Sequence, residues 1–222
     1  MREIFQQDLE QVGNDLVLMA QKVRSAVTDA TVALETGDLA LAEQVIAKDR
    51  EIDSLQDGLD AQCVTLLARQ QPVATDLRVV VVGLRLSATL ERMGDLARHV
   101  AEIARGRMPE QALPEQARGV FADMAAAVRT VADDVVALLE GHSLELAYRV
   151  MEDDERLDDL HKETFRLMLA PSADTSSLTP QELVDITLLG RYFERFGDHG
   201  VAVARRILFL VTGEEAVKSG IR

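Results

Sequence analysis

Apolar side chains recur at intervals of three and four residues along most of this chain. In the first stretch they include Phe5, Leu9, Val12 and Leu16. This spacing places the side chains on one face of an α-helix, so it predicts an amphipathic helix. The pattern resumes five times, and each interruption contains Gly or Pro. Six helices are predicted, over residues 3–35, 39–70, 76–105, 114–140, 144–169 and 181–212.

The third predicted helix lacks a polar face, and the sixth is broadly apolar as well. Residues 77–90 read LRVVVVGLRLSATL, with Arg78 and Arg85 as the only charged residues. A helix that is apolar nearly all round is buried by neighbours on several sides. Residues 79–82 alone would also suit a strand, but the apolar run continues beyond Gly83 at helical spacing. The chain is therefore predicted to be all-α.

The second half of the chain repeats the first. Residues 38–46 (DLALAEQVI) align with residues 143–151 (SLELAYRVM) at an offset of 105. The pentapeptides at residues 91–95 (ERMGD) and 194–198 (ERFGD) lie at an offset of 103. Agreement at helix caps, core positions and acidic positions together indicates an internal duplication.

The duplication predicts two tandem three-helix bundles with short connections between antiparallel neighbours. The first bundle is expected over residues 1–108 and the second over residues 114–222. Residues 106–114 (GRMPEQALP) contain a Gly and two Pro, which is typical of a linker. A second loop is expected over residues 171–180 (PSADTSSLTP).

Four acid-x-x-x-acid pairs stand at equivalent places in the two repeats. They are Asp49/Asp53, Glu91/Asp95, Asp154/Asp158 and Glu194/Asp198. Residues four apart on a helix lie on one face, about 5–6 Å apart at Cβ. With 38 acidic residues among 222, roughly six such pairs are expected by chance, so the spacing alone carries little weight. Their recurrence at matching positions of the repeat favours a shared role.

Two antiparallel helices of one unit would bring their acid pairs together into a four-carboxylate cluster. Carboxylate oxygens are hard ligands that suit Mg²⁺, Ca²⁺, Mn²⁺ or iron. His99 is a possible further ligand, because it follows Glu91 and Asp95 at steps of four. A role in positioning the ligands or in binding a partner is expected for four other residues. They are Arg78, Arg92, Arg195 and His199.

A Gly precedes the Asp of each pentapeptide. Gly94 and Gly197 each weaken a helix interior by about 1 kcal/mol relative to Ala. A Gly repeated at that place indicates the close approach of another helix, or of a bound ion or partner; helix packing is the favoured interpretation.

Composition excludes several classes of protein. The net charge of −14 argues against nucleic-acid binding, which needs a basic face, and against free association with anionic membranes. The single Cys63 excludes an internal disulfide and is expected to be a buried thiol in a reducing compartment. The N-terminus has no apolar signal core, and no apolar run approaches 18 residues. A cytoplasmic protein is expected.

The residues do not point to catalysis. The chain has no Glu-x-x-His, no His-Glu-x-x-His and no phosphate-binding Gly-x-x-x-x-Gly-Lys loop. A non-enzyme is therefore predicted. Two alternatives stay open: a metal-dependent enzyme or metal-storage bundle, and a helical scaffold whose acidic residues only confer solubility.

The chain resembles the PhoU family, the regulatory proteins of phosphate transport. The matching residues are Met1-Arg2 with Phe5, Thr75–Arg78, Glu91–Asp95, Glu194–His199 and Leu210–Gly213. The resemblance implies a cytoplasmic, all-α, non-enzymatic negative regulator, usually a homodimer. It implies a link between the ATPase subunit of the phosphate ABC transporter and a sensor histidine kinase, with membrane contact only through these partners.

The same resemblance implies iron, zinc, manganese or magnesium ions at the acidic motifs, with the eight paired acids as ligands. Both copies depart from the family pattern Asp-His-Ala-x-Asn. The first copy has Leu96 and His99 in place of His and Asn, and the second has Gly200 and Ala202 after His199. A His99 ligand would therefore be particular to this chain.

Overall fold

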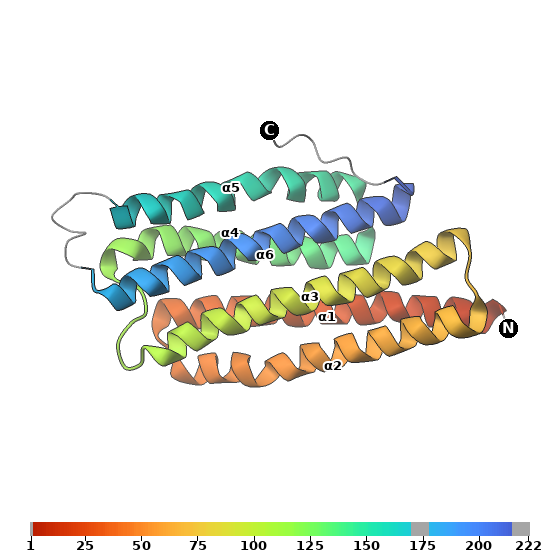
Figure 1. The fold of residues 1–222 in the computed structure, drawn as a ribbon, viewed down its shortest axis with the longest axis horizontal. Coiled ribbons are helices and arrows are strands. Elements are labelled where there is room, and N and C mark those ends of the chain that lie inside the picture. The colour runs from red at the N-terminus through yellow and green to blue at the C-terminus, as the bar shows by residue number, and fades with distance from the viewer. Residues whose placement is uncertain (1, 170–177, 215–222) are drawn as a thin grey trace.

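In the computed structural model, residues 2–169 and 178–214 are described, and these residues form six α-helices (Figure 1). The helices are α1 (Arg2–Thr36), α2 (Leu39–Gln70), α3 (Ala74–Gly106), α4 (Glu115–Gly141), α5 (Leu144–Leu169) and α6 (Pro180–Thr212). The predicted all-α class and all six predicted helices are confirmed. Their bounds agree with the prediction to within two residues.

Helix ends follow local chemistry. Gly37 has φ +70° and ends α1, and the Asp38 carboxylate accepts a hydrogen bond of 3.0 Å from the Leu41 N–H at the start of α2. The predicted loop over residues 171–180 lies outside the described residues except for its last three. There Thr179 caps α6 in a reciprocal arrangement with Glu182.

The helices are arranged as two three-helix units that lie against each other. Figure 1 shows α1, α2 and α3 in one unit and α4, α5 and α6 in the other. The units meet where α1 contacts α4 and where α3 contacts α6. The buried core of the molecule consists mainly of Ala, Val and Leu, with three fully buried Phe side chains in the second unit. These are Phe121, Phe193 and Phe196.

Helix α3 occupies the middle of the molecule, which explains its almost continuous apolar surface. It packs on α1 and α2 in its own unit and on α6 in the other. Val80, Leu86 and Leu90 are fully buried as a result. The predicted burial on several sides is confirmed, and the cause is the contact with the second unit.

Helices α3 and α6 run antiparallel, and contacts between the C-terminal part of α3 and the N-terminal part of α6 define their register. The rings of His99 and Tyr192 lie 5.2 Å apart between centroids. One turn or two beyond, Arg107 donates to Asp185 at 2.8 Å. We refer to the line along which α3 and α6 meet as the α3/α6 seam.

The pentapeptide glycines permit the close packing that the sequence predicts. A Cβ atom at Gly94 would lie 2.9 Å from Cδ1 of Ile52 on α2. A Cβ at Gly197 would lie 2.7 Å from Cδ1 of Leu157 on α5. Both distances are shorter than a normal contact between carbon atoms. Each Gly therefore lets the third helix of its unit approach the second.

No helix within residues 2–169 and 178–214 is long and apolar enough to cross a membrane. The predicted buried thiol is also found. Cys63 is fully buried, and this burial raises its pKa to about 11.

Candidate functional site: two acidic clusters

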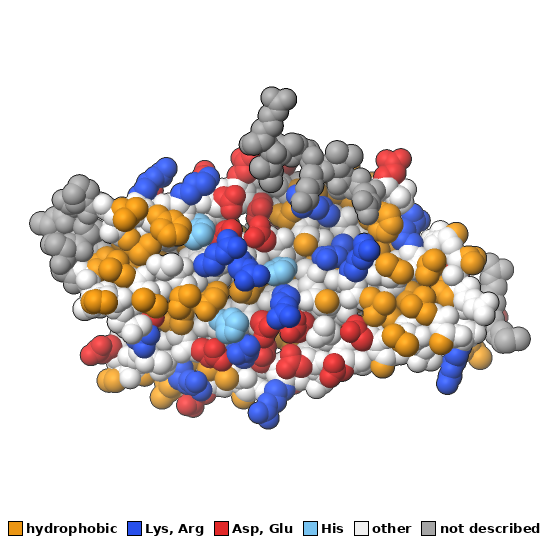
Figure 2. Space-filling view, in the orientation of Figure 1, with side chains coloured by type: hydrophobic (Ala, Val, Ile, Leu, Met, Phe, Trp, Pro, Cys, Tyr) orange, Lys and Arg blue, Asp and Glu red, His pale blue; other side chains and the backbone are white. Residues whose placement is uncertain are grey.

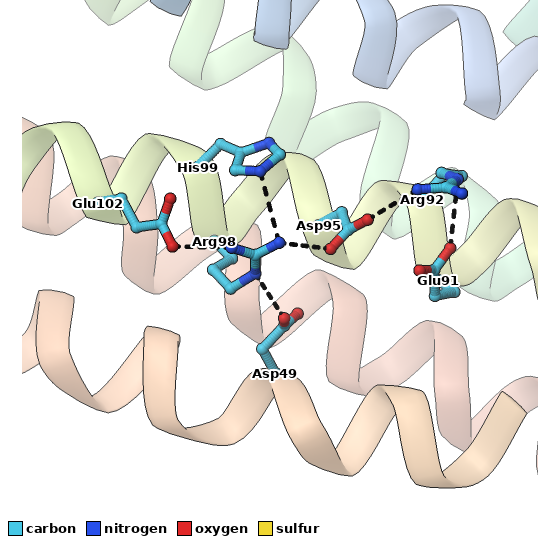
Figure 3. Close-up of polar contacts among 7 residues, drawn as sticks. All are labelled: Asp49, Glu91, Arg92, Asp95, Arg98, His99 and Glu102. Carbon is cyan, nitrogen blue, oxygen red and sulfur yellow. Dashed lines mark hydrogen bonds and ion pairs between the residues drawn. The ribbon is translucent and has the colours of Figure 1, made fainter. Parts of the chain in front are cut away.

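In the first unit, acidic residues of α2 and α3 converge, as predicted, but they converge on an arginine (Figure 3). The guanidinium of Arg98 contacts three carboxylates. Its Nε lies 2.6 Å from Asp49 Oδ2, its Nη2 lies 2.7 Å from Asp95 Oδ1, and its Nη1 lies 2.7 Å from Glu102 Oε1. We call these four residues, with Glu91 and Asp53, the first acidic cluster.

Arg98 compensates a charge that the fold has largely removed from water. Asp49 is only 9% exposed, and a buried carboxylate is costly unless it is paired. Burial raises the pKa of Asp49, and the neighbouring Arg98 acts in the opposite direction. The hydrogen bond to Asp95 in turn raises the pKa of Arg98, which stays a cation at every accessible pH.

The remaining members of this cluster are Glu91 and Asp53, which do not contact Arg98. Arg92 lies 3.5 Å from Glu91 Oε2 and 3.1 Å from Asp95 Oδ2. Burial, and then the charge of Asp95, raises the pKa of Glu91. Asp53 is exposed, and its negative charge acts on both Glu91 and Asp49. The predicted acids of the first unit are thus close enough to interact electrostatically.

In the second unit, the equivalent acids lack such an arginine. Val201 stands at the place of Arg98 in the repeat, 103 residues further on. We call Asp154, Asp158, Glu194 and Asp198 the second acidic cluster. Among the described residues, only Glu194 of this set has an ion-pair partner, which is Arg191 on the same helix.

The uncompensated charge is visible in the pKa of Asp154. Burial raises this pKa to about 6, and the charges of Asp198, Asp158 and Glu194 add to the effect, while Arg205 opposes it. The second, smaller part of this effect shows that Asp198, Asp158 and Glu194 lie close enough to repel the Asp154 carboxylate when all four are ionised. A cation placed among them would relieve the repulsion.

The two clusters differ in how well they suit a metal ion. Within residues 2–169 and 178–214, no group of three His, Cys, Asp or Glu side chains is arranged to hold one. In the first cluster a guanidinium stands between the carboxylates, so the residues as arranged do not fit a metal. The second cluster has four hard carboxylates of the kind that divalent ions prefer, and no guanidinium of the described residues bridges them as Arg98 does in the first, although their side chains as placed do not form a metal site either. Its role as a metal site stays a prediction.

The structure places His99 toward the second unit. Its ring stacks near Tyr192, its Nε2 lies 3.4 Å from Arg98 Nη2, and its Nδ1 is buried with no hydrogen-bond partner in the described part of the chain. A metal bridging Glu91, Asp95 and His99 would require a different His99 rotamer.

The basic residues that the sequence predicts to position ligands or bind a partner lie along or beside the α3/α6 seam. They are Arg78, Arg92, Arg195 and His199. The Arg78 guanidinium is 5.9 Å from the centroid of the Phe209 ring. His199 is partly buried, and burial together with Arg195 lowers its pKa. Arg92 acts on His199 in the same direction from across the seam.

Two residues of the first cluster were not predicted from the sequence. Arg98 and Glu102 follow Asp95 by three and seven residues, which puts all three on one face of α3. That spacing is a signal for helical ion pairs. It does not reveal that Asp49 of another helix completes the set.

Comparison with known proteins identifies the family. The PhoU domain model matches the chain twice, over residues 16–104 and 121–207. The phosphate-specific transport system accessory protein PhoU homolog 2 of Mycobacterium tuberculosis is 38% identical over 213 residues, which cover 96% of this chain and 99% of that protein. The corresponding PhoU homolog of Clostridium acetobutylicum is 30% identical over 217 residues, covering 96% and 97%.

Solved structures agree with this assignment. The crystal structure of PhoU from Pseudomonas aeruginosa superposes with a TM-score of 0.82 at 29% identity, covering 95% of this chain and all of that one. A PhoU structure from Streptococcus pneumoniae gives a TM-score of 0.81 at 25% identity, covering 96% and 99%. Both family matches coincide with the two three-helix units, and this chain therefore belongs to the PhoU family.

Proposed function

We propose that this protein is a cytoplasmic, non-enzymatic regulator of phosphate uptake and of the phosphate-starvation response. The observation that carries the proposal is similarity over nearly the whole chain to accessory proteins of phosphate-specific transport. In this role the protein links the ATPase subunit of the phosphate ABC transporter to a sensor histidine kinase. It restrains the starvation response when phosphate is abundant, and it acts as a homodimer.

The surface charge supports binding to other proteins. The net charge is −14, and part of the negative charge lies in the two acidic clusters, one in each unit. Such surfaces attract basic segments of partner proteins and accelerate their association. The same charge disfavours direct binding to nucleic acid or to an anionic membrane, so contact with the membrane is made through the partners.

A divalent cation at the second acidic cluster is part of the proposal. Asp154, Asp158, Glu194 and Asp198 supply the oxygen ligands, and the ion would offset the repulsion that, together with burial, raises the pKa of Asp154. The ion is iron, zinc, manganese or magnesium. In the first cluster Arg98 supplies the positive charge instead.

Partner capture tests this function. The immobilised protein is exposed to the transporter ATPase subunit and to the cytoplasmic part of the kinase from the same organism. Capture of both is expected, and weaker capture is expected for Glu194→Ala/Asp198→Ala. The matched control is Asp159→Ala/Glu163→Ala, which removes two exposed acids of the same spacing on α5. Failure of the wild-type protein to bind either partner would overturn the proposal.

Gene deletion tests the sign of the regulation. Cells without this protein should express phosphate-starvation genes in phosphate-rich medium, and a copy of the wild-type gene should restore repression. Unchanged repression in the deletion strain would contradict the negative role.

Sedimentation of the purified protein at micromolar concentration tests the homodimer, which should give twice the mass of the chain.

A further inference from the structure

Basic residues recur at steps of seven on both sides of the α3/α6 seam. Seven residues correspond to about two helical turns, so such positions lie on nearly the same face. The aligned positions are Arg78, Arg85, Arg92 and His99 on α3, and Tyr192, His199 and Arg206 on α6, followed by Gly213 directly after its end.

The register of the seam places like charges opposite each other. His99 faces Tyr192 at one end, and the Arg78 guanidinium lies against Gly213 at the other. Arg85 precedes His99 by fourteen residues and Arg206 follows Tyr192 by fourteen, so the two arginines face each other. The antiparallel register thus sets one guanidinium across from another near the middle of the seam.

Electrostatic interactions agree with this register. Burial lowers the pKa of Arg206, and the charge of Arg85 lowers it further. Arg206 also contributes to lowering the pKa of His199, one step of seven along α6. These interactions require Arg85, Arg206 and His199 to lie near one another.

The positive charge at this place is not compensated within the described chain. The side chains of Arg85, Arg195 and Arg206 form no ion pair or hydrogen bond with another residue of 2–169 or 178–214. Nη1 of Arg206 is buried and has no hydrogen-bond partner there. A buried guanidinium N–H without an acceptor is unfavourable, and this protein has 38 acidic side chains that could have supplied one.

The surroundings limit the size of an anion that could fit. Figure 2 shows Lys and Arg side chains gathered over the α3/α6 seam, with Asp and Glu side chains on either side of them. An extended polyanion would meet these acids and be repelled. A small oxyanion would contact only the basic groups.

We propose that the α3/α6 seam binds a small, doubly charged oxyanion of the phosphate class between Arg85 and Arg206. Guanidinium groups donate paired N–H bonds that match the spacing of phosphate oxygens. The anion accepts from the guanidinium groups of Arg85 and Arg206, and it removes the repulsion between them. Arg195 and His199 contribute further positive charge or N–H donors on α6.

This site is independent of the partners proposed above, because the anion contacts only this chain. It also joins the two units, since Arg85 belongs to the first and Arg206 to the second. Binding there would favour the arrangement in which α3 and α6 are packed together. The site can therefore be tested on the purified protein, whatever the outcome of the partner experiments.

Isothermal titration calorimetry with inorganic phosphate tests the proposal. Low ionic strength limits screening, and a chelator keeps phosphate from binding through a metal at the acidic clusters. Saturable binding of about one phosphate per chain is expected. Arg85→Gln and Arg206→Gln should each weaken binding tenfold or more. Arg166→Gln, which removes an exposed arginine of α5, should change the dissociation constant less than twofold.

Two results would overturn the proposal. One is the lack of saturable binding to the wild-type protein, and the other is equal binding by the wild type and both seam variants. Arg85 is exposed, so Arg85→Gln should retain the fold even if Arg206→Gln does not, and circular dichroism checks this. As a second measurement, phosphate should shift the NMR signals of the His199 ring and leave those of the exposed His142 ring unchanged. The reverse pattern would place the anion elsewhere.

Discussion

Replacing Arg98 by Val would give the first acidic cluster the residue that the second cluster has at Val201. The substitution removes a guanidinium that contacts Asp49, Asp95 and Glu102 at 2.6–2.7 Å. It leaves the short apolar side chain of Val in place of the guanidinium. The first cluster would then hold its acids without a cation, as the second one does.

The expected cost follows from the exposure of the ion pairs. Breaking a fully buried pair costs about 3–5 kcal/mol, whereas an exposed pair contributes about 0.2–1 kcal/mol. Asp49 is 9% exposed, but the Arg98 side chain is 26% exposed and the Glu102 side chain more so. The cost of breaking these ion pairs is therefore lower than that of a fully buried pair. We expect Arg98→Val to reduce the free energy of unfolding by about 2–3 kcal/mol at neutral pH.

Urea unfolding followed by circular dichroism, in the presence of a chelator, measures this change. The control is Arg92→Val, which removes an arginine that is 63% exposed and also contacts Asp95. Its expected cost is about 0–1 kcal/mol. If Arg98→Val cost no more than Arg92→Val, the guanidinium would not be what stabilises the buried charge of Asp49, and the reasoning would be refuted.

Three further predictions concern the second cluster and its helix packing. Asp154 has a pKa of about 6 in the folded protein against an ordinary 3.8, so the folded state binds more protons between these values, and its stability falls as pH rises through 6. Asp154→Asn should therefore stabilise the metal-free protein by about 1–2 kcal/mol at pH 7 and by almost nothing near pH 4; urea unfolding at both pH values measures the difference, and equal effects would contradict it. Gly197→Ala should destabilise the folded protein by about 1–3 kcal/mol, because the added Cβ would meet Leu157. Gly119→Ala, on open helix surface, should stabilise it by about 0.5–1 kcal/mol. Thermal unfolding compares the two variants, and a more stable Gly197→Ala than Gly119→Ala would exclude the close-packing role of Gly197. In the second cluster, added Mn²⁺ should raise the unfolding midpoint of the wild type but not of Glu194→Ala/Asp198→Ala, and an equal rise in both would exclude that cluster as the binding site.

Local chemistry explains why the fold could be predicted from the sequence. Apolar spacing, caps such as Asp38 and breaks such as Gly37 each act within a few residues, and all of them indicated the same six helices. The almost continuous apolar run of α3 predicted burial on several sides. Which neighbour completes that burial depends on how the two units dock, which a periodic pattern does not contain.

The acidic pairs could be found from the sequence because the duplication repeats them. The inequality of the two clusters was harder to predict, because it depends on one position. Arg98 and Val201 are equivalent in the repeat, but many arginines in this chain lie three residues from an acid. Only the three-dimensional structure shows that Arg98 reaches across to Asp49 on α2.

The α3/α6 seam could not be predicted for a related reason. The steps of seven from Arg78 and from Tyr192 are visible in the sequence, but each helix alone shows an ordinary mixture of charged residues. That Arg85 faces Arg206 depends on the antiparallel register of helices from different units. Tertiary packing, and not helix propensity, determines that register.

Elemental analysis of protein purified without chelator or nickel tests most directly the claim that the two acidic clusters are compensated differently. The wild type should carry divalent metal at the second cluster. Glu91→Ala/Asp95→Ala should keep that metal, because Arg98 already supplies the cation of the first cluster, and Glu194→Ala/Asp198→Ala should lose it. A metal-free wild type, or metal lost from the first variant and retained by the second, would contradict the claim.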